Sequence, residues 1–524
     1  MPDTSQHKGN ARESVIGSWP GVFWLFLLSL VLYIATANRG PQWQDSGDYI
    51  WRIVQGQLLS PLGLALSHPL HHWLGRGVTS FVPLEPSFAI TLVSASAAAV
   101  AVACVYGCVV TLTANRVAAL FAAISLALAN TFWHLATITE VYTLSAALLA
   151  GECWCLVKYA REHRRVFLWG MLLLNGIGLA NHLSAVLTMP VLAVVAVWAV
   201  RQRHVTPKDV AMGIGFWVIG ALPYLCLVGQ ELMRSGDFWG TVGSALFGKS
   251  THSYAGHVLN VSLSGKLLGA SLVFVVYNFP NLLLPAAFYG MAQGRRVGVS
   301  ALAKWALLAG FIIHSVFVLR YSVIDRHTFF LPMYVFLVLF GGIGAATVLQ
   351  WPRSTWRRIV IGTGVCLLVV TPAFYAVGTA AARELGVLGS YVRNKPYRDD
   401  YAYLLLPWAS AERSAERMSA EAVRLAGSSG LIVVEDPMAI SAIRYKVWRT
   451  GLAELDVISA SQSDSIRRAA VANRPVVLVP RKAELVGIPA PMGSWRHRGD
   501  LYVLDVAKTS RTTRPTATDS MVAP

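Results

Sequence analysis

Residues 21–49 read GVFWLFLLSLVLYIATANRGPQWQDSGDY. The first part is an apolar run of the length that crosses a bilayer as a helix, which takes about 20 residues. The second part is polar and acidic, and it follows the apolar run at once. Ala35-Thr36-Ala37 resembles the cleavage site of a signal peptide. Because many further apolar runs follow, we expect an uncleaved first membrane helix.

The rest of the chain has the same apolar character. Its 524 residues are 55% hydrophobic and 14% charged, whereas soluble domains carry about 25% charged residues. This composition predicts an α-helical polytopic membrane protein. We expect about eleven transmembrane helices, centred near residues 28, 100, 124, 149, 174, 191, 219, 278, 310, 339 and 367. Asn278-Phe279-Pro280-Asn281 predicts a kink in the eighth.

The net charge of +17 comes from short basic clusters between apolar runs. By the positive-inside rule these clusters place the N-terminus in the cytoplasm and, with an odd number of spans, the C-terminus outside. No folded basic face is evident, so we exclude nucleic acid as a partner. The long loops 38–85 and 229–265 then lie outside, and the first is predicted to hold surface helices at 46–57 and 68–77.

The composition divides the chain into four predicted parts. They are a cytoplasmic segment at 1–19, a membrane domain at 20–377, an extracytoplasmic α/β domain at 378–507 and a disordered tail at 508–524. The α/β domain is indicated by short β-like runs at 431–434, 455–458, 475–479 and 501–504, separated in part by helical stretches at 414–425 and 461–472.

Two acidic side chains open the first predicted outer loop. Asp45 and Asp48 are three residues apart, so on a helix they share one face. One carboxylate could take a proton from an acceptor hydroxyl while the other holds or tunes it. In the alternative, Asp45 caps the following helix and Asp48 is its third residue.

Three more ionisable side chains fall at the same predicted membrane face, where such groups are costly and often have a task. His68 is a candidate donor to a phosphate or to the acceptor. Glu140 could bind sugar hydroxyls or orient a basic group, and Asn181 or His182 could reach a phosphate. The structural alternatives are a helix start at His68, an ion pair or hydrogen bond of Glu140, and an interfacial His182. His68, His71 and His72 have the spacing of metal ligands on a helix, but no HExxH motif accompanies them. We therefore assign none of them as a metal ligand, although a divalent metal remains an alternative.

The fourth candidate group is Asp325-Arg326. A lipid phosphate that leaves needs a cation at the level of the headgroups, and the planar, permanently charged guanidinium suits phosphate. Arg326, with Arg320 as second choice, is the candidate. A surface ion pair between Asp325 and Arg326 is the structural alternative.

Short motifs occur in order along residues 20–345. They are Asp45-Ser46-Gly47-Asp48, His68-Pro69, Phe132-Trp133 with Glu140-Val141-Tyr142, Gly178 with Asn181-His182, and Tyr321 with Asp325-Arg326 and Leu331-Pro332. In this order they resemble the bacterial multi-spanning family related to the transmembrane protein O-mannosyltransferases, which is placed in the GT-C glycosyltransferase superfamily.

The resemblance implies a GT-C fold and a polyprenyl-phosphate sugar donor. It also implies that a carboxylate of the first outer loop is the base, which maps onto Asp45 with Asp48 beside it. The mapped partners are His68, Glu140, His182 and Arg326.

This sequence departs from the family's pattern at two places. Asp48 stands where the family often has Glu, which shortens the reach of that carboxylate. The His-Pro motif continues with Leu70-His71-His72 instead of Pro and Gly, which puts the acceptor in doubt.

Together these features predict an inverting glycosyltransferase of the bacterial inner membrane. It would transfer a sugar, mannose in the favoured case, from the polyprenyl-phosphate donor to a protein or glycan acceptor outside the cell. The alternative is a transporter or lipid flippase, which only the 278–281 break favours. A non-catalytic assembly or sensor protein is a third reading, in which Asp45 could be replaced without loss of function.

Overall fold

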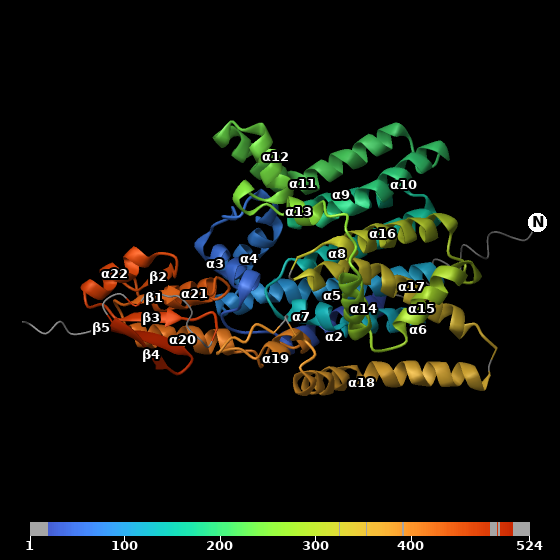
Figure 1. The fold of residues 1–524 in the computed structure, drawn as a ribbon. Coiled ribbons are helices and arrows are strands. Elements are labelled where there is room, and N and C mark those ends of the chain that lie inside the picture. The colour runs from blue at the N-terminus through green and yellow to red at the C-terminus, as the bar shows by residue number, and fades with distance from the viewer. Residues whose placement is uncertain are drawn as a thin grey trace, which may run out of the picture. The chain divides into compact units, whose positions relative to one another are not determined.

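A computed structural model describes residues 19–323, 325–352, 354–389, 392–482, 490 and 493–506. The chain forms two compact units, one of the residues up to Arg393 together with Asp399–Ala415, the other of Asn394–Arg398 with the residues from Glu416 onward. Figure 1 shows the first unit as a bundle of helices and the second as a small sheet with helices. Apart from Trp19, the predicted segment 1–19 and the predicted tail 508–524 lie outside the described residues.

Helices long and apolar enough to cross a bilayer make up most of the first unit. Seven of them in the described residues qualify alone: Trp19–Thr36 (α2), Pro86–Thr113 (α5), Leu183–Arg201 (η2 with α10), Pro207–Ser235 (α11), Ala301–Arg320 (α16), Arg326–Leu349 (η5 with α17) and Thr355–Leu385 (α18). Two bent pairs raise the number to nine: Arg116–Ala127 (α6) with Asn130–Thr137 (α7), and Gly265–Asn278 (α14) with Leu283–Val297 (α15 with η4). The protein is therefore an integral membrane protein.

The predicted number of eleven spans is not confirmed, although each predicted centre falls in a helix. The two remaining predicted spans correspond to α8 (Tyr142–Glu162) and α9 (Arg165–Asn181). In α8, Glu152 and Lys158 interrupt the apolar run, and α9 has 17 residues. Neither helix is therefore both long and apolar enough to qualify alone.

Two helices form the centre of the bundle. The apolar windows of α5 and α17 are 72% and 89% buried, whereas those of α2 and α18 are 17% and 22% buried. Close approach of α17 to α15 depends on glycine, because a Cβ at Gly344 would collide with the carbonyl oxygen of Ala286. The exposed apolar side chains of the outer helices are therefore available to contact lipid.

The predicted kink near residue 278 is confirmed. α14 and α15 meet at 100°, and Asn278 makes hydrogen bonds at the break. Its Oδ1 accepts a hydrogen bond from the backbone N–H of Thr131 at 2.7 Å, and its carbonyl accepts one from the Tyr375 hydroxyl at 3.1 Å. The broken helix is thus joined to α7 and α18 by hydrogen bonds.

Short elements fill the two long loops. In the first loop, the predicted surface helices are confirmed with shifted ends as α3 (Gln44–Gln55) and α4 (Pro69–Phe81), separated by η1 (Leu64–Leu66). The second loop holds α12 (Phe238–Phe247), η3 (Ser250–His252) and α13 (Ala255–Val258).

The first unit extends beyond the predicted domain boundary. Residue 377 lies inside α18, which ends at Gly386 in the left-handed conformation that closes many helices (φ 63°). The stretch Asp399–Ala415, with α19 (Asp400–Leu405), also belongs to this unit. There the backbone N–H of Ala409 donates to the Thr36 carbonyl at 2.9 Å, which ties the stretch to the end of α2.

The second unit is a five-stranded sheet of order β2-β1-β3-β5-β4. β1 pairs in parallel with β2 and β3, and β5 pairs antiparallel with β3 and β4. Its elements are α20 (Ser414–Ala426), β1 (Leu431–Val434), α21 (Ile440–Thr450), β2 (Asp456–Ser459), α22 (Ser463–Val471), β3 (Val476–Val479), β4 (Gly493–Arg498) and β5 (Leu501–Val506). The four predicted strands are present, whereas β4, a mostly exposed polar edge strand, was not predicted.

A buried ion pair lies at the end of β1 in this unit. The Lys395 ammonium and the Asp436 carboxylate form the pair, and their side chains are 2% and 3% exposed. The Tyr397 hydroxyl lies 2.9 Å from Asp436 Oδ2 and 3.2 Å from the Pro480 carbonyl oxygen. The segment Asn394–Arg398 is thereby fixed against the carboxyl ends of β1 and β3.

Candidate active site

The start of α3 is fixed by the residues before it. Gln42 accepts a hydrogen bond from the backbone of Thr139 at 2.8 Å, and the Trp43 indole donates one to Ser414 at 2.9 Å. Trp43 is the N-cap, and no side chain caps the helix. The alternative in which Asp45 caps this helix is therefore wrong, because Asp45 lies in the first turn.

The Asp45 carboxylate has the environment of a base. Its side chain is exposed to solvent, although many protein atoms surround it. Desolvation by these atoms, followed by the negative charges of Asp325 and Asp48, raises the pKa of Asp45 to about 7. Among the described residues none donates a hydrogen bond to the carboxylate. Asp45 is thus free to take a proton near neutral pH.

Asp48 has a different environment. Its Oδ2 lies 3.5 Å from the Arg52 guanidinium one turn further along α3. Arg52 is 3% exposed and also donates to the carbonyl groups of Leu58 at 2.8 Å and Leu66 at 3.2 Å. The pair of Asp48 and Arg52 therefore holds the loop after α3. This contact favours Asp45 over Asp48 as the base.

Glu140 lies beside Asp45 in a buried position. Its Oε1 accepts a hydrogen bond from the Ser46 hydroxyl at 2.8 Å, while its Oε2 is buried and has no hydrogen-bond partner in the described part of the chain. Burial, and then the charge of Asp45, raises the pKa of Glu140 well above its usual value. Burial thus favours the neutral form of Glu140, and Ser46 joins it to the turn that carries Asp45.

We expect Glu140→Gln to keep the fold and to raise thermal stability increasingly as the pH rises from 5 to 8. An unfolded Glu ionises near pH 4.3, whereas the buried carboxyl stays protonated. Folding above that pH therefore takes up a proton, and the wild type loses stability as the pH rises. Gln has no titrating group and keeps an oxygen for Ser46. The measurement is Tm in detergent across this range.

The control for this prediction is Glu140→Ala. It leaves the Ser46 hydroxyl without its acceptor and opens a cavity, so its Tm should be below that of the wild type at every pH. A difference in Tm between Glu140→Gln and wild type that does not change with pH would contradict a neutral Glu140.

His68 and His182 are brought together from positions far apart in the chain. Their rings stack with an interplanar angle of 5° and centroids 5.3 Å apart. His68 is the N-cap of α4 with φ 48°, and its Nδ1 lies 2.7 Å from the Asn181 carbonyl oxygen. Asn181 also donates to the carbonyl of Val141 at 2.9 Å, which links the pair to the segment that carries Glu140.

Asp325 and Arg326 each have contacts with other parts of the first unit. Asp325 lies close enough to Asp45 for its charge to raise the pKa of that carboxyl. Arg326 instead donates to the Leu267 carbonyl at 3.0 Å, and its guanidinium lies 6.0 Å from the centroid of the Phe330 ring. The charge of Arg393 acts on Asp325 and lowers its pKa, although burial raises it overall.

No group of three or more His, Cys, Asp or Glu side chains within the described ranges could hold a metal ion. The His68, His71 and His72 spacing thus does not produce a ligand set in this structure. His71 and His72 are buried, and the His71 ring packs against Tyr49 with centroids 5.5 Å apart.

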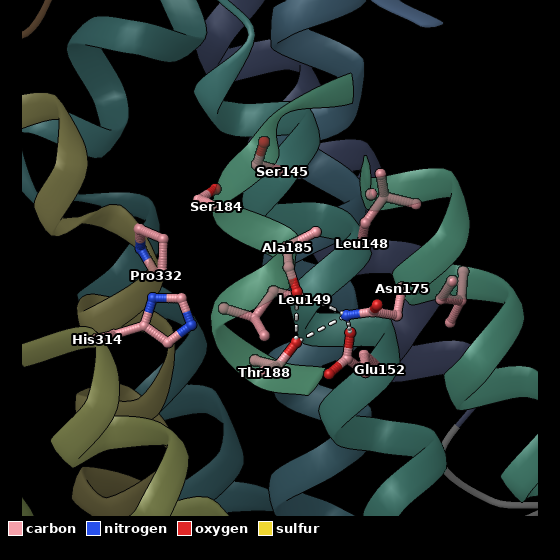
Figure 2. Close-up of a pocket in the computed structure, with 12 residues that line it drawn as sticks. Ser145, Leu148, Leu149, Glu152, Asn175, Ser184, Ala185, Thr188, His314 and Pro332 are labelled. Carbon is pink, nitrogen blue, oxygen red and sulfur yellow. Dashed lines mark hydrogen bonds between the residues drawn. The ribbon is translucent and has the colours of Figure 1, made fainter. Parts of the chain in front are cut away.

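A pocket with polar and apolar side chains lies among α8, α9, η2, α16 and α17. It is lined by Ser145, Leu148, Leu149, Glu152, Leu174, Asn175, Gly178, Ser184, Ala185, Thr188, His314 and Pro332. The Asn175 amide donates to Glu152 at 3.1 Å and to Thr188 at 2.8 Å. Figure 2 shows His314 across the pocket from this group. The buried Glu152 has a structural partner, and none of the predicted site residues lines the pocket.

Several residues of the site were not predicted. Ser46 and Tyr49 lie in or beside the acidic motif, but no role was assigned to them. For the buried Arg52 the only indication in the sequence is its position four residues after Asp48. Arg393 was placed in the α/β domain. Outside the site, Glu152 is a carboxylate inside an apolar run, and the sequence could have singled it out because such residues are rare in membrane helices.

Comparisons with known proteins agree with this fold. Residues 45–206 match the family described as the protein O-mannosyl-transferase TMEM260 N-terminal domain. The structure is similar to ArnT from Cupriavidus metallidurans bound to undecaprenyl phosphate, with a TM-score of 0.59, 14% identity, and coverage of 94% of this chain and 98% of ArnT. For the apo state of ArnT the TM-score is 0.59 and the identity 14%, and the match covers 93% of this chain and 98% of ArnT. No curated protein sequence matches the chain.

A weaker similarity is to the S. cerevisiae protein O-mannosyltransferase Pmt1–Pmt2 complex bound to the sugar donor. Its TM-score is 0.33 at 14% identity, over 41% of this chain and 33% of the other, which is too low to support an inference. The fold assignment rests on the family match and on the similarity to ArnT. The chain therefore has a GT-C fold, and its resemblance to the membrane family related to the transmembrane protein O-mannosyltransferases is confirmed.

Proposed function

We propose that this protein is an inverting glycosyltransferase that takes a sugar from a polyprenyl-phosphate donor. The observation that carries the proposal is Asp45, a solvent-exposed carboxylate of the first outer loop beside Asp325 and Glu140, with a pKa of about 7 and no hydrogen-bond donor on it among the described residues. A general base works best when its pKa lies near the working pH. The family match over residues 45–206 begins at this residue.

The proposed reaction is a single displacement. Asp45 takes the proton of an acceptor hydroxyl, whose oxygen forms a bond to the anomeric carbon of the sugar. The bond from that carbon to the phosphate oxygen breaks, and the electron pair leaves with the polyprenyl phosphate. Because the new bond forms on the face opposite to the leaving group, the anomeric configuration inverts. Arg326 is the proposed counter-charge for the phosphate.

The donor class is supported by the fold. ArnT, whose fold this chain shares, was determined with undecaprenyl phosphate bound. The proposed acceptor is a protein hydroxyl or another acceptor on the extracytoplasmic side, and mannose is the favoured sugar. The basic residues of the short loops support a cytoplasmic N-terminus and a site at the outer face of a bacterial inner membrane.

The transporter alternative has less support. At the break between α14 and α15 that favoured it, Asn278 makes hydrogen bonds with Thr131 and Tyr375, whereas transporters use broken helices to hold substrate and ions. A lipid flippase needs no general base, and Asp45 would then have no task.

The proposal is tested by sugar transfer in nanodiscs from a panel of radiolabelled polyprenyl-phosphate sugars, mannose included. We expect turnover of at least one donor and release of polyprenyl phosphate, with the opposite anomeric configuration in the product. Absence of turnover with every donor, together with movement of lipid between the leaflets, would overturn the proposal in favour of the flippase.

A further inference from the structure

The stacked rings of His68 and His182 have defined hydrogen-bonding partners on one edge. His68 Nδ1 lies 2.7 Å from the carbonyl oxygen of Asn181. A carbonyl oxygen only accepts, so this Nδ1 carries the hydrogen. In the neutral imidazole, His68 Nε2 then holds the lone pair and is an acceptor.

His182 has the opposite arrangement. Its Nδ1 lies 3.1 Å from the backbone nitrogen of Ser184 and 3.0 Å from the Ser184 hydroxyl. The hydroxyl can donate or accept, but the backbone N–H only donates, so this Nδ1 holds the lone pair. In the neutral ring His182 Nε2 then carries the hydrogen and is a donor. Burial lowers the pKa of His182 to about 4 and that of His68 well below its usual value, so both rings are neutral at pH 7.

Both Nε2 atoms lack a partner in the protein. Neither makes a hydrogen bond in the described part of the chain, and neither belongs to the fully buried, unpartnered atoms, as His71 Nε2 does. The His68 side chain is buried and His182 is half-buried. Both Nδ1 atoms point to the segment of residues 181–184, so both Nε2 atoms face away from it. The parallel rings thus present an acceptor and a donor side by side.

This pair of groups fits a hydroxyl better than a phosphate. A hydroxyl group donates and accepts, so it can serve both nitrogens. The oxygens of an ionised phosphate only accept, and the lone pair of His68 Nε2 would face them without a hydrogen. We propose that His68 and His182 bind hydroxyl groups of the donor sugar, His182 as donor and His68 as acceptor, and that neither binds the lipid phosphate. The inference rests on the proposed function.

Two matched variants remove the Nε2 groups and keep the contacts of Nδ1. In His68→Asn, the amide nitrogen can still donate to the Asn181 carbonyl. In His182→Asn, the amide oxygen can still accept from the Ser184 N–H. The binding probes are undecaprenyl phosphate and undecaprenyl-phosphate mannose, each titrated onto the full-length protein in nanodiscs.

We expect each variant to weaken binding of undecaprenyl-phosphate mannose about tenfold, which corresponds to ~1.4 kcal/mol, and to leave the Kd of undecaprenyl phosphate unchanged. An equal loss for both probes would overturn the inference and assign the histidines to the phosphate. If the wild type binds neither probe, the proposed function itself fails.

An independent readout is ¹⁵N NMR of the imidazole nitrogens in the wild type at pH 7. We expect an unprotonated Nε2 in His68 and a protonated Nε2 in His182. A protonated His68 Nε2 would overturn the inference whatever the binding data show, because the acceptor for the hydroxyl would be lost. Retention of the folded state by both variants is checked by Tm.

Discussion

Asp45→Asn should lower kcat for sugar transfer by about 10²- to 10⁴-fold, the usual contribution of a general base. Asn has nearly the same shape and cannot take the proton. No hydrogen bond to Asp45 is lost, because no described residue donates one to its carboxylate. The Kd of the donor should therefore stay within about twofold, and the Tm should not fall. The measurement is single-turnover transfer with the best donor of the panel.

The control for this prediction is the pH dependence of the wild type. Activity should rise with pH through about 7, because only the ionised Asp45 accepts a proton. Asp325→Asn removes a negative charge that raises the pKa of Asp45, so its profile should shift to lower pH. Full turnover by Asp45→Asn would remove Asp45 as the base and assign the role to Asp48.

Asp436→Leu should destabilise the sheet unit by about 3–5 kcal/mol, because it leaves the ammonium of Lys395 buried without its carboxylate. The Tyr397 hydroxyl loses an acceptor at the same time. The measurement is hydrogen exchange of the amides of β1 and β3 in the full-length protein, where the loss of protection reports the local free energy of unfolding.

The double variant Lys395→Met with Asp436→Leu is the matched control. It removes both charges, and replacement of a buried ion pair by apolar side chains is often neutral. We expect it to recover most of the protection that Asp436→Leu loses. Equal losses in the single and double variants would show that Lys395 and Asp436 do not act as a pair.

Most of the fold could be predicted from the sequence because apolar runs of about 20 residues have few alternatives to a membrane helix. The kink at Asn278 was also predictable, since Pro280 cannot continue a helix ladder. The number of spans was not, because Glu152 and Lys158 make α8 less apolar than its neighbours. Only the partners supplied by other helices make such a segment acceptable in a bilayer.

The candidate site was predicted as a set of residues but not as a geometry. That Asp45 and Asp325 interact follows from tertiary structure, as does the stacking of His68 on His182. The sequence favoured Arg326 as a partner of phosphate, yet its contact with the Leu267 carbonyl depends on the position of α14. Contacts of this kind between distant segments have no local pattern.

The hydrogen bond between Glu152 and Asn175 has a consequence for how the chain is made. The two residues are 23 positions apart, on α8 and on α9, which follows it. α8 leaves the ribosome first, and a charged side chain at the centre of a helix costs about 2.5–3.5 kcal/mol on insertion. The Asn175 amide offsets this cost only once α9 is present. The two helices should therefore leave the translocon together, as a hairpin.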